Sequence, residues 1–307
     1  MLRNVAGLRF FVRYRMICWP RLCCKGKQSV RSRCLLVVDA DPAVHKLVTG
    51  ILRHDGRSIE DAYDGREALE RLRALPCDVV LAGQGRNGYD GLRLVRRIRS
   101  IQPDARVIVT GEQNPERVVN ALRERAFGYV HVPLAEGSLV ETVQQALESS
   151  QWQDDLRVLS ARPEWITLEV RCKIGAADRT THFLRELHAD LAAQVRDDVA
   201  AAFRELLMNA IEHGGRSDPR KRVRVSILRT GRSLIVHIAD PGHGFSLDLL
   251  PHAAINNPEN SPIAHVEVRA EEGRRPGGFG ILMCRNLVDE LLYNQRGNAV
   301  LFVKYLS

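Results

Sequence analysis

No part of this sequence is apolar enough to cross a lipid bilayer, because no run approaches the roughly 18 uninterrupted apolar residues that a spanning helix needs. The first residues also lack the apolar core of a signal peptide, since Arg9, Arg13 and Arg15 interrupt it. These absences exclude an integral membrane protein and predict a cytoplasmic location.

The sequence also lacks the usual cysteine motifs. Its seven cysteines form no C-x-x-C pair, and an odd number in 307 residues is no disulfide framework. The ten histidines never fall at paired ligand spacing with these cysteines, so zinc ligation is unsupported. A G-x-x-x-x-G-K-[ST] motif is absent as well, which excludes a P-loop nucleotide site.

The basic charge of the chain is concentrated in one segment. Lys and Arg number 45 against 37 Asp and Glu, a net charge of +8. Residues 1–33 hold nine of the basic residues and no acidic one, which leaves 36 basic and 37 acidic residues, a net charge of −1, in 34–307. A nearly neutral folded region gives no reason to expect a nucleic-acid partner.

Residues 1–33 show no sustained helical or strand period, and we interpret them as a disordered basic tail. Two alternatives remain open. The aromatic side chains among the arginines would suit a membrane-surface anchor. The segment would instead be an upstream extension if the protein starts at Met16.

From residue 34 the sequence alternates short apolar runs with helical periods. Strands are predicted at 35–38, 79–82, 106–110 and 129–132, and helices at 42–54, 91–101, 115–126 and 136–148. Strands that alternate singly with helices form a parallel sheet covered on both faces. Residues 34–150 are therefore predicted to be an α/β, flavodoxin-like, doubly wound domain.

The remainder of the chain has a different order of elements. Residues 151–162 are predicted to be a linker and 163–307 a second domain. In it we expect strands at 165–172, 223–229 and 233–240, helices at 177–191, 197–213 and 279–291, and a closing hairpin around 296–298. Because helices and antiparallel strands do not alternate singly, this domain is predicted to be an α+β sandwich.

Several short segments of the first domain occur in an order and spacing typical of one known domain. They are Leu-Val-Val-Asp ending at Asp39, the segment 64–69 (Asp-Gly-Arg-Glu-Ala-Leu), Asp90-Gly91, Thr110 and Pro133. Together they resemble the receiver domain of two-component response regulators. The resemblance implies a phosphorylation site with two adjacent carboxylates for Mg²⁺, an aspartate nucleophile, a Ser or Thr, and a lysine.

That site is incomplete in this chain. Asp39 has no acidic neighbour, because Asp41 is displaced by one residue. The nucleophile position is Gly83 and the lysine position is Val132, while Thr110 supplies the hydroxyl. Because glycine cannot attack a phosphodonor, we predict a degenerate pseudo-receiver that is not phosphorylated in the usual way and serves docking or dimerisation.

A G-x-G-x-x-G pattern at 83–88 follows a predicted strand. The dinucleotide fingerprint belongs to the first strand of its unit and runs directly into a helix. Here Tyr89 and Asp90 intervene, and Asp104 precedes the next strand instead of ending it. We interpret the segment as a flexible loop.

Three segments of the second domain stand out by their order and spacing. Glu205 and Asn209 lie four residues apart on one face of a helix that continues to His213. Asp240-Pro-Gly242-His-Gly244 follows a strand, and Gly277-Gly278-Phe279-Gly280 opens the last helix. Each alone suits a solvated helix face, a turn or a hinge. Together they resemble the N, G1 and G2 boxes of the GHKL (Bergerat) ATP-binding fold.

The resemblance implies an ATP and Mg²⁺ site. Asp240 would bond the adenine amino group, with Gly242 and Gly244 allowing close approach of the backbone. Asn209 would complete the Mg²⁺ coordination, and His213 would stack on or bond to the nucleotide. Backbone N–H groups of the last box would face the phosphates, and a lid would span 246–276. The glycines of this last box are Gly277, Gly278 and Gly280. Arg274 and Arg275 precede them and either reach the γ-phosphate or are solvated.

Glu205 narrows the class of GHKL protein that the resemblance implies. A carboxylate four residues before the metal-binding asparagine can take a proton from an attacking hydroxyl. Histidine kinases need a preceding helical hairpin with a phosphorylatable histidine. Residues 149–162 are too short for one, and His188 is expected to have a surface or packing role. The short lid and the 287–290 ending of the last helix resemble the anti-sigma-factor serine kinases most.

We therefore expect an ATP-dependent serine/threonine kinase that phosphorylates an anti-sigma-factor antagonist. A sigma factor is the expected sequestered partner, and a homodimer the expected assembly. The alternative is a non-catalytic module in which ATP sets the lid conformation and the output is sequestration of a partner.

Overall fold

The computed structural model describes residues 33–53, 58–85, 89–244 and 279–306. The predictions for the basic tail, for the lid with Arg274 and Arg275, and for Gly277 and Gly278 lie outside the described residues. Within the described ranges, no helix is both long and apolar enough to cross a membrane.

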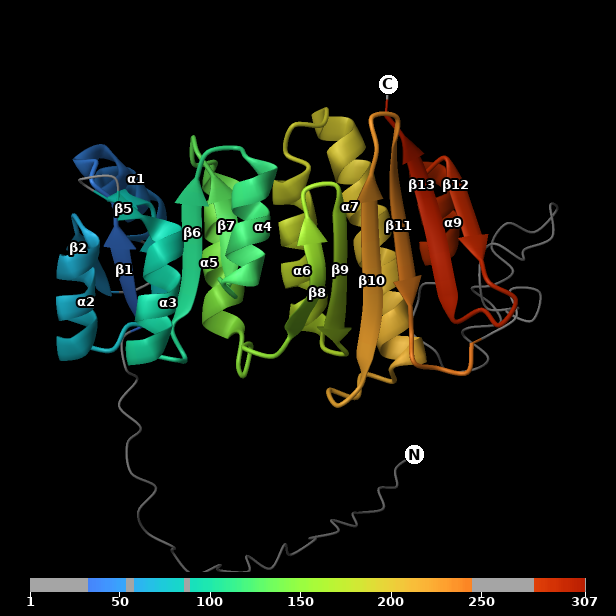
Figure 1. The fold of residues 1–307 in the computed structure, drawn as a ribbon, viewed down its shortest axis with the longest axis horizontal. Coiled ribbons are helices and arrows are strands. Elements are labelled where there is room, and N and C mark those ends of the chain that lie inside the picture. Colours follow the sequence, from blue (N-terminus) through green and yellow to red (C-terminus); the bar gives the residue numbers. More distant parts are fainter. Residues whose placement is uncertain (1–32, 54–57, 86–88, 245–278, 307) are drawn as a thin grey trace, which may run out of the picture. The chain divides into compact units, whose positions relative to one another are not determined.

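A five-stranded parallel sheet organises the first half of the described chain (Figure 1). The strand order β2-β1-β3-β6-β7 is the flavodoxin-like topology predicted from the sequence. The strands are β1 (Cys34–Val38), β2 (Ser58–Ala62), β3 (Val79–Ala82), β6 (Arg106–Gly111) and β7 (Gly128–His131). The helices are α1 (Pro42–Leu52), α2 (Gly65–Ala74), α3 (Gly91–Ile101), α4 (Pro115–Arg123) and α5 (Glu136–Glu148).

Polar residues determine where four of these helices begin. Asp41, Asp64, Asp90 and Asn114 each precede a helix, and each side chain accepts a hydrogen bond from a backbone N–H of the first turn. Such caps satisfy donors that a helix leaves unpaired. Strands β1 and β3 are buried along their whole length, as expected for a sheet covered on both faces.

The G-x-G-x-x-G segment does not lead into a helix. Gln84–Gly85 (β4) pairs antiparallel with Tyr89–Asp90 (β5), so the chain folds back on itself before α3 begins at Gly91. A dinucleotide fingerprint requires a direct strand-to-helix turn. The short hairpin therefore agrees with the rejection of a dinucleotide site.

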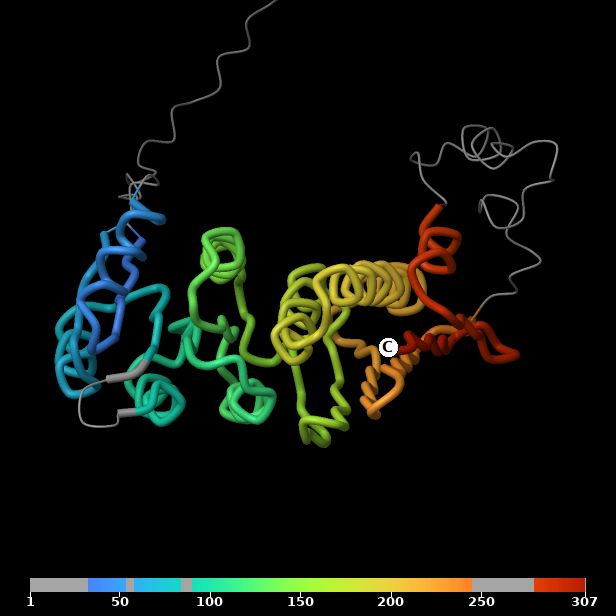
Figure 2. The backbone as a smooth tube through the Cα atoms, turned by 90° about the horizontal axis from the view of Figure 1, so that it is seen from above, coloured from blue at the N-terminus to red at the C-terminus, as the bar shows by residue number. Residues whose placement is uncertain are grey.

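A six-stranded antiparallel sheet organises the second half, in the order β12-β13-β11-β10-β9-β8. Figure 2 shows α6 and α7 side by side on one face of this sheet. The predicted α+β sandwich is confirmed. The strands are β8 (Leu156–Arg162), β9 (Trp165–Arg171), β10 (Arg222–Arg229), β11 (Ser233–Ala239), β12 (Glu290–Tyr293) and β13 (Ala299–Tyr305); the helices are α6 (Ile174–Leu187), α7 (Ala193–Asn209), the π-helical turn η3 (Ala210–Gly214) and α9 (Gly280–Leu287).

Helices α6 and α7 begin three and four residues earlier than predicted, and the second half differs from the sequence prediction in two further places. β8 occupies part of the expected linker, where it forms an antiparallel hairpin with β9. The last helix ends at Leu287, not at 291, because 290–293 alternates between more and less exposed residues and pairs with β13. An alternating period belongs to a strand, so the 287–290 segment is no helix ending.

The helix α6 also bonds to the backbone of the first half through Arg179. This side chain is 4% exposed, and its guanidinium donates hydrogen bonds of 2.7, 2.7 and 3.1 Å to the carbonyl oxygens of Phe127, Ala126 and Trp152. Its charged carbon lies 5.1 Å from the ring centre of Phe127 and 4.9 Å from that of Trp152. Residues 126–152 and α6 are therefore joined by one buried cation.

Candidate functional site

The structure brings Asp39, Gly83 and Thr110 together at the carboxyl ends of β1, β3 and β6. A Cβ placed on the buried Gly83 would overlap Oδ2 of Asp39 and lie 2.9 Å from Oγ1 of Thr110. The carboxylate of Asp39 therefore fills the space that a side chain at position 83 would need.

The other expected partners have different roles, although the N–H of Asp41 donates a 2.9 Å hydrogen bond to Oδ1 of Asp39. The side chain of Asp41 caps α1 by accepting a 2.8 Å hydrogen bond from the N–H of Ala43. Val132, in the lysine position, is 40% exposed and uncharged. In the part of the chain that the structure describes, no group of three or more His, Cys, Asp or Glu residues is arranged to hold a metal ion.

Sequence reasoning missed one residue beside this cluster. His45 on α1 is 4% exposed, with Nδ1 2.7 Å from Oδ1 of Asp61 and Nε2 2.9 Å from the carbonyl oxygen of Asp39. Asp61 lies on β2, whose range the apolar pattern did not mark. No sequence signal therefore joined His45 to the acidic residues.

In the second half, Glu205 on α7 meets Gly280, the first residue of α9. A Cβ placed on Gly280 would overlap Oε1 of Glu205 and lie 2.8 Å from its carboxyl carbon. Glu205 is also close to Cys284 and Tyr293. Burial, with a smaller contribution from the charge of Glu205, raises the pKa of Cys284 to about 12 and also raises the pKa of Tyr293.

Asp240 lies between two glycines at the end of β11. A Cβ placed on Gly214 would overlap the carboxyl group of Asp240, and one placed on Gly242 would lie 2.7 Å from its Oδ1. The N–H of Gly242 donates a 2.7 Å hydrogen bond to that oxygen. Burial raises the pKa of Asp240 above its usual value. The ends of the first and second sequence boxes are therefore in contact.

The loop after Asp240 is supported by the closing hairpin, which sequence reasoning did not assign to the site. The carbonyl oxygen of Asn298 accepts a 2.9 Å hydrogen bond from the N–H of Asp240, and its side-chain amide lies 3.4 Å from the carbonyl oxygen of Gly242. Gly244 has a φ of +84°, and a Cβ there would overlap the carbonyl oxygen of Arg296. Glycine is therefore required at 244 by both backbone angle and space.

Asn209 and His213 lie at the carboxyl end of the same helix. Asn209 is the last residue of α7 and is partly exposed. His213 lies in the π-helical turn and is exposed. His188, by contrast, is buried at the end of α6, where burial and then the charge of Arg229 lower its pKa to about 4. Of the surface and packing roles that the sequence left open for His188, the structure shows the packing one.

Comparison with known families agrees with this geometry. Residues 35–144 match the response regulator receiver domain, and residues 173–304 match the histidine kinase-like ATPase domain. The chain joins a receiver domain to a histidine kinase-like ATPase domain. That composition is typical of a signalling protein with an ATP-binding domain.

The curated relatives match about half of this chain. The transcriptional regulatory protein ZraR of Escherichia coli O157:H7 is 27% identical over 154 residues, 50% of this chain and 34% of its own length. The nitrogen assimilation regulatory protein NtrX of Azorhizobium caulinodans is 30% identical over 150 residues, 48% of this chain and 33% of its own. The match spans about a third of each relative.

Among solved structures, the receiver domain of NtrX from Brucella abortus is 30% identical. The match covers 38% of this chain and 99% of that one, with a TM-score of 0.36.

The described residues of the ATPase domain fit the ATP that its family implies. Oδ2 of Asp240 has no hydrogen-bond partner among the described residues, and the side chain is partly buried, so it offers an acceptor for an amino group. Gly214 and Gly242 keep side chains away from this carboxyl group. Gly280, the first residue of α9, has no side chain and lies against the carboxylate of Glu205.

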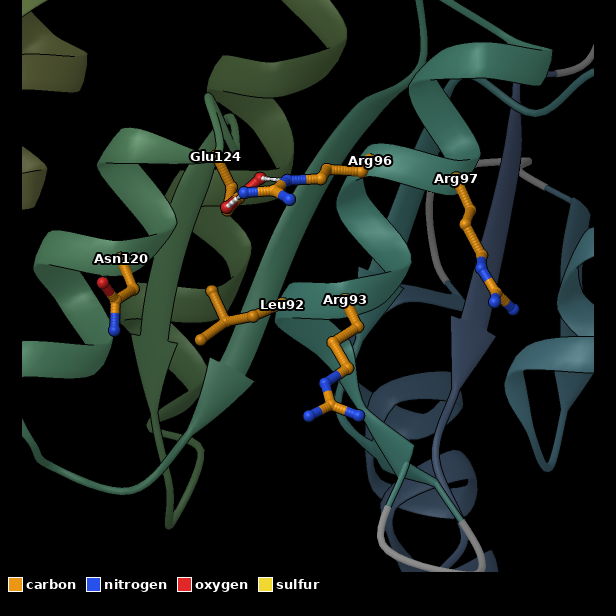
Figure 3. A pocket seen from close by; sticks show the side chains of 6 residues that line it. All are labelled: Leu92, Arg93, Arg96, Arg97, Asn120 and Glu124. Atoms are coloured by element: carbon orange, nitrogen blue, oxygen red, sulfur yellow. Dashed lines mark hydrogen bonds and ion pairs between the residues drawn. The ribbon is translucent and has the colours of Figure 1, made fainter.

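A hollow of about 480 Å³ lies elsewhere, between α3 and α4 of the receiver domain (Figure 3). Arg96 reaches across it to Glu124, while Arg93 and Arg97 point away from that pair. Its lining residues are Leu92, Arg93, Arg96, Arg97, Asn120 and Glu124, none of which is a predicted site residue.

Proposed function

We propose that this chain is an ATP-dependent serine/threonine kinase of the anti-sigma-factor type. Its substrate is a hydroxyl group on a small anti-sigma-factor antagonist, and a sigma factor is the partner that phosphorylation affects. The observation that supports the proposal best is the contact of Glu205 with Gly280, which sets a carboxylate against the helix terminus where phosphates would bind.

Glu205 is the proposed general base. It lies one helical turn before Asn209, so both side chains project from the same face of α7. A carboxylate there can take the proton of an incoming serine hydroxyl as the oxygen attacks phosphorus.

Asp240 and Asn209 are the proposed nucleotide-binding residues. The free oxygen of Asp240 would accept a hydrogen bond from the adenine amino group, and the amide oxygen of Asn209 would face a Mg²⁺ ion. ATP bound with Mg²⁺ would supply the phosphoryl group, and the metal would partly neutralise its charge. Because Gly280 has no side chain, the N–H groups of the first turn of α9 would be open to phosphate oxygens.

The receiver domain is the proposed regulator, acting without phosphorylation. Arg179 joins α6 to the backbone of the receiver domain. On the same helix, Asp178 accepts a 2.8 Å hydrogen bond from Arg204, the residue before Glu205 on α7. A shift of the receiver domain would therefore move α6 and, through this ion pair, the helix that carries the base.

The proposal is tested by incubating the full chain with γ-labelled ATP and purified candidate antagonists encoded nearby. We expect label on a serine or threonine of one antagonist, and a loss of at least about 100-fold in Glu205→Ala with ATP affinity retained. Glu212→Ala is the matched control, because Glu212 is an exposed glutamate in the adjoining π-helical turn and should leave the rate unchanged.

The remaining outcomes separate the alternatives. Transfer that persists in Glu205→Ala would rule out the base assignment. Tight ATP binding with no label on any antagonist would favour the non-catalytic sequestration module. Sedimentation equilibrium of the full chain tests the proposed homodimer, which a purely monomeric species would contradict.

A further inference from the structure

Two buried cysteines of the receiver domain are in contact. Cys34 is the first residue of β1, and Cys77 lies two residues before β3; they are 7% and 6% exposed. Their Sγ atoms are 2.6 Å apart. This separation is about half an ångström longer than the roughly 2.05 Å of a disulfide bond.

The backbone holds the two sulfur atoms together. The N–H of Asp78 donates a 2.9 Å hydrogen bond to the carbonyl oxygen of Cys34, and the N–H of Cys34 donates a 2.9 Å bond to the side chain of Asp78. The N–H of Cys77 donates to Oε1 of Gln102 at 3.2 Å. Because β1 and β3 are neighbours in the sheet, the backbones that carry the two cysteines are held close together.

The two thiols are not equivalent. The hydrogen bond with Cys77 lowers the pKa of Cys34 to about 7, while the same contact and burial raise the pKa of Cys77. At neutral pH a substantial fraction of the pair therefore carries one thiolate, and Cys34 is the more acidic of the two thiols. The other buried cysteines differ, because burial raises the pKa of Cys172 to about 11 and that of Cys284 to about 12.

We propose that Cys34 and Cys77 form a redox-modifiable pair that hydrogen peroxide converts to a disulfide. Burial favours a small oxidant over a bulky disulfide reagent. The Cys34 thiolate attacks one peroxide oxygen and hydroxide leaves, which gives a sulfenic acid. The Cys77 sulfur then attacks the Cys34 sulfur and loses its proton as water departs. Two thiols and one peroxide thus become one disulfide and two waters.

The crosslink would tie the start of β1 to the segment before β3. The chain between them contains α1, β2 and α2, so the bond closes a long loop. Closing a loop restricts the unfolded chain more than the folded one. The oxidised receiver domain should therefore unfold at a higher temperature than the reduced one.

The test uses the full chain with Cys18, Cys23 and Cys24 replaced by Ser, so that no tail cysteine competes. Reduced protein is treated with one to ten equivalents of hydrogen peroxide and measured by intact mass, non-reduced peptide mapping and thermal unfolding. We expect a mass loss of two hydrogen atoms, a peptide linking Cys34 to Cys77, a higher unfolding midpoint, and full reversal by dithiothreitol.

Matched variants decide what the mass change means. Cys77→Ala should abolish the linked peptide and leave Cys34 as a trapped sulfenic acid, whereas Cys172→Ala should change nothing. The proposal is overturned if no linked peptide forms in the unsubstituted pair, or if Cys34 reacts no faster than Cys172 and Cys284. The main comparison is between oxidised and reduced forms of one protein, so a variant that folds poorly does not obscure it.

Discussion

The carboxylate of Glu205 packs against Gly280, so two segments far apart in the chain meet where α7 passes the start of α9. The absence of a side chain at 280 creates the space that the carboxylate occupies. The position of the proposed base therefore depends on a glycine in another element.

Gly280→Ala should displace Glu205 and slow phosphoryl transfer. The added methyl group would take the place of Oε1, and a base moved by about 1 Å loses roughly 10- to 100-fold in rate. We expect a fall in kcat with a much smaller change in the dissociation constant of ATP, measured by isothermal titration calorimetry.

Gly137→Ala is the control for this substitution. Gly137 is the second residue of α5, and a Cβ there would meet nothing within 4 Å. The variant should keep the wild-type rate and be equally or slightly more stable. Equal rates for wild type and Gly280→Ala would contradict the positioning of Glu205.

Gly83→Asp should not restore receiver phosphorylation. The new side chain would overlap Asp39, and overpacking of this kind costs about 1–3 kcal/mol in the free energy of unfolding. With acetyl phosphate and Mg²⁺, we expect no hydroxylamine-sensitive mass increase in this variant. The same assay on the unsubstituted chain should also show no increase, and an increase there would refute the pseudo-receiver interpretation.

The double variant Gly83→Asp/Asp39→Ala tests whether steric overlap with Asp39 causes the loss of stability in Gly83→Asp. Removing the Asp39 carboxylate makes room for a side chain at 83, so most of the lost stability should return, as measured by urea unfolding. A double variant no more stable than Gly83→Asp alone would show that the two positions do not compete for one space.

Asp240→Asn should weaken ATP binding by roughly 10- to 100-fold, the effect of losing a charged hydrogen bond. Because burial raises the pKa of Asp240, wild-type affinity should fall with decreasing pH earlier than an exposed aspartate would cause. Calorimetry across pH 4–7 measures both effects. A pH-independent difference between the two proteins would count against Asp240 as the acceptor.

Asp240→Asn, which should weaken ATP binding, should not lower the free energy of unfolding. Because the pKa of Asp240 is raised in the folded state, folding favours the protonated side chain. Protonation of Asp240 therefore stabilises the fold fully below the pKa of the unfolded state. This stabilisation is lost as the pH rises through the pKa of the folded state. Asp240→Asn should therefore be at least as stable as wild type at pH 7 in urea unfolding. A clear loss of stability would mean that the Asp240 carboxylate has a structural role.

Arg179→Met should destabilise the chain by about 2–4 kcal/mol, because three buried carbonyl groups lose their donor while apolar volume is kept. Arg185→Met on the same helix is the control. Its exposed ion pair with Asp197 should contribute less than about 1 kcal/mol. Urea unfolding measures the loss of stability in each variant. Equal losses in Arg179→Met and Arg185→Met would show that the buried hydrogen bonds of Arg179 contribute no more than an exposed ion pair.

Much of the fold followed from local pattern. Strand β3 and helices α3 and α5 have the ranges that the sequence predicted, because continuous apolar runs and helical periods are strong near each of them. β8 was missed because its alternation is weak: four of its seven residues are exposed, counting both apolar Leu159 and polar Arg157. The last helix was drawn too long because Leu287 to Leu292 suits either a helix or a strand.

The sequence by itself determined the residue types and spacing of the candidate site, such as Glu205 four residues before Asn209, because helical geometry fixes which of them share a face. It also determined that Gly83 cannot act as a nucleophile. Only the tertiary structure decided that Asp39 fills the space at Gly83, that Gly280 receives Glu205, and that Asn298 supports Asp240. These contacts join residues distant in sequence, and packing between elements, which no local period encodes, brings them together.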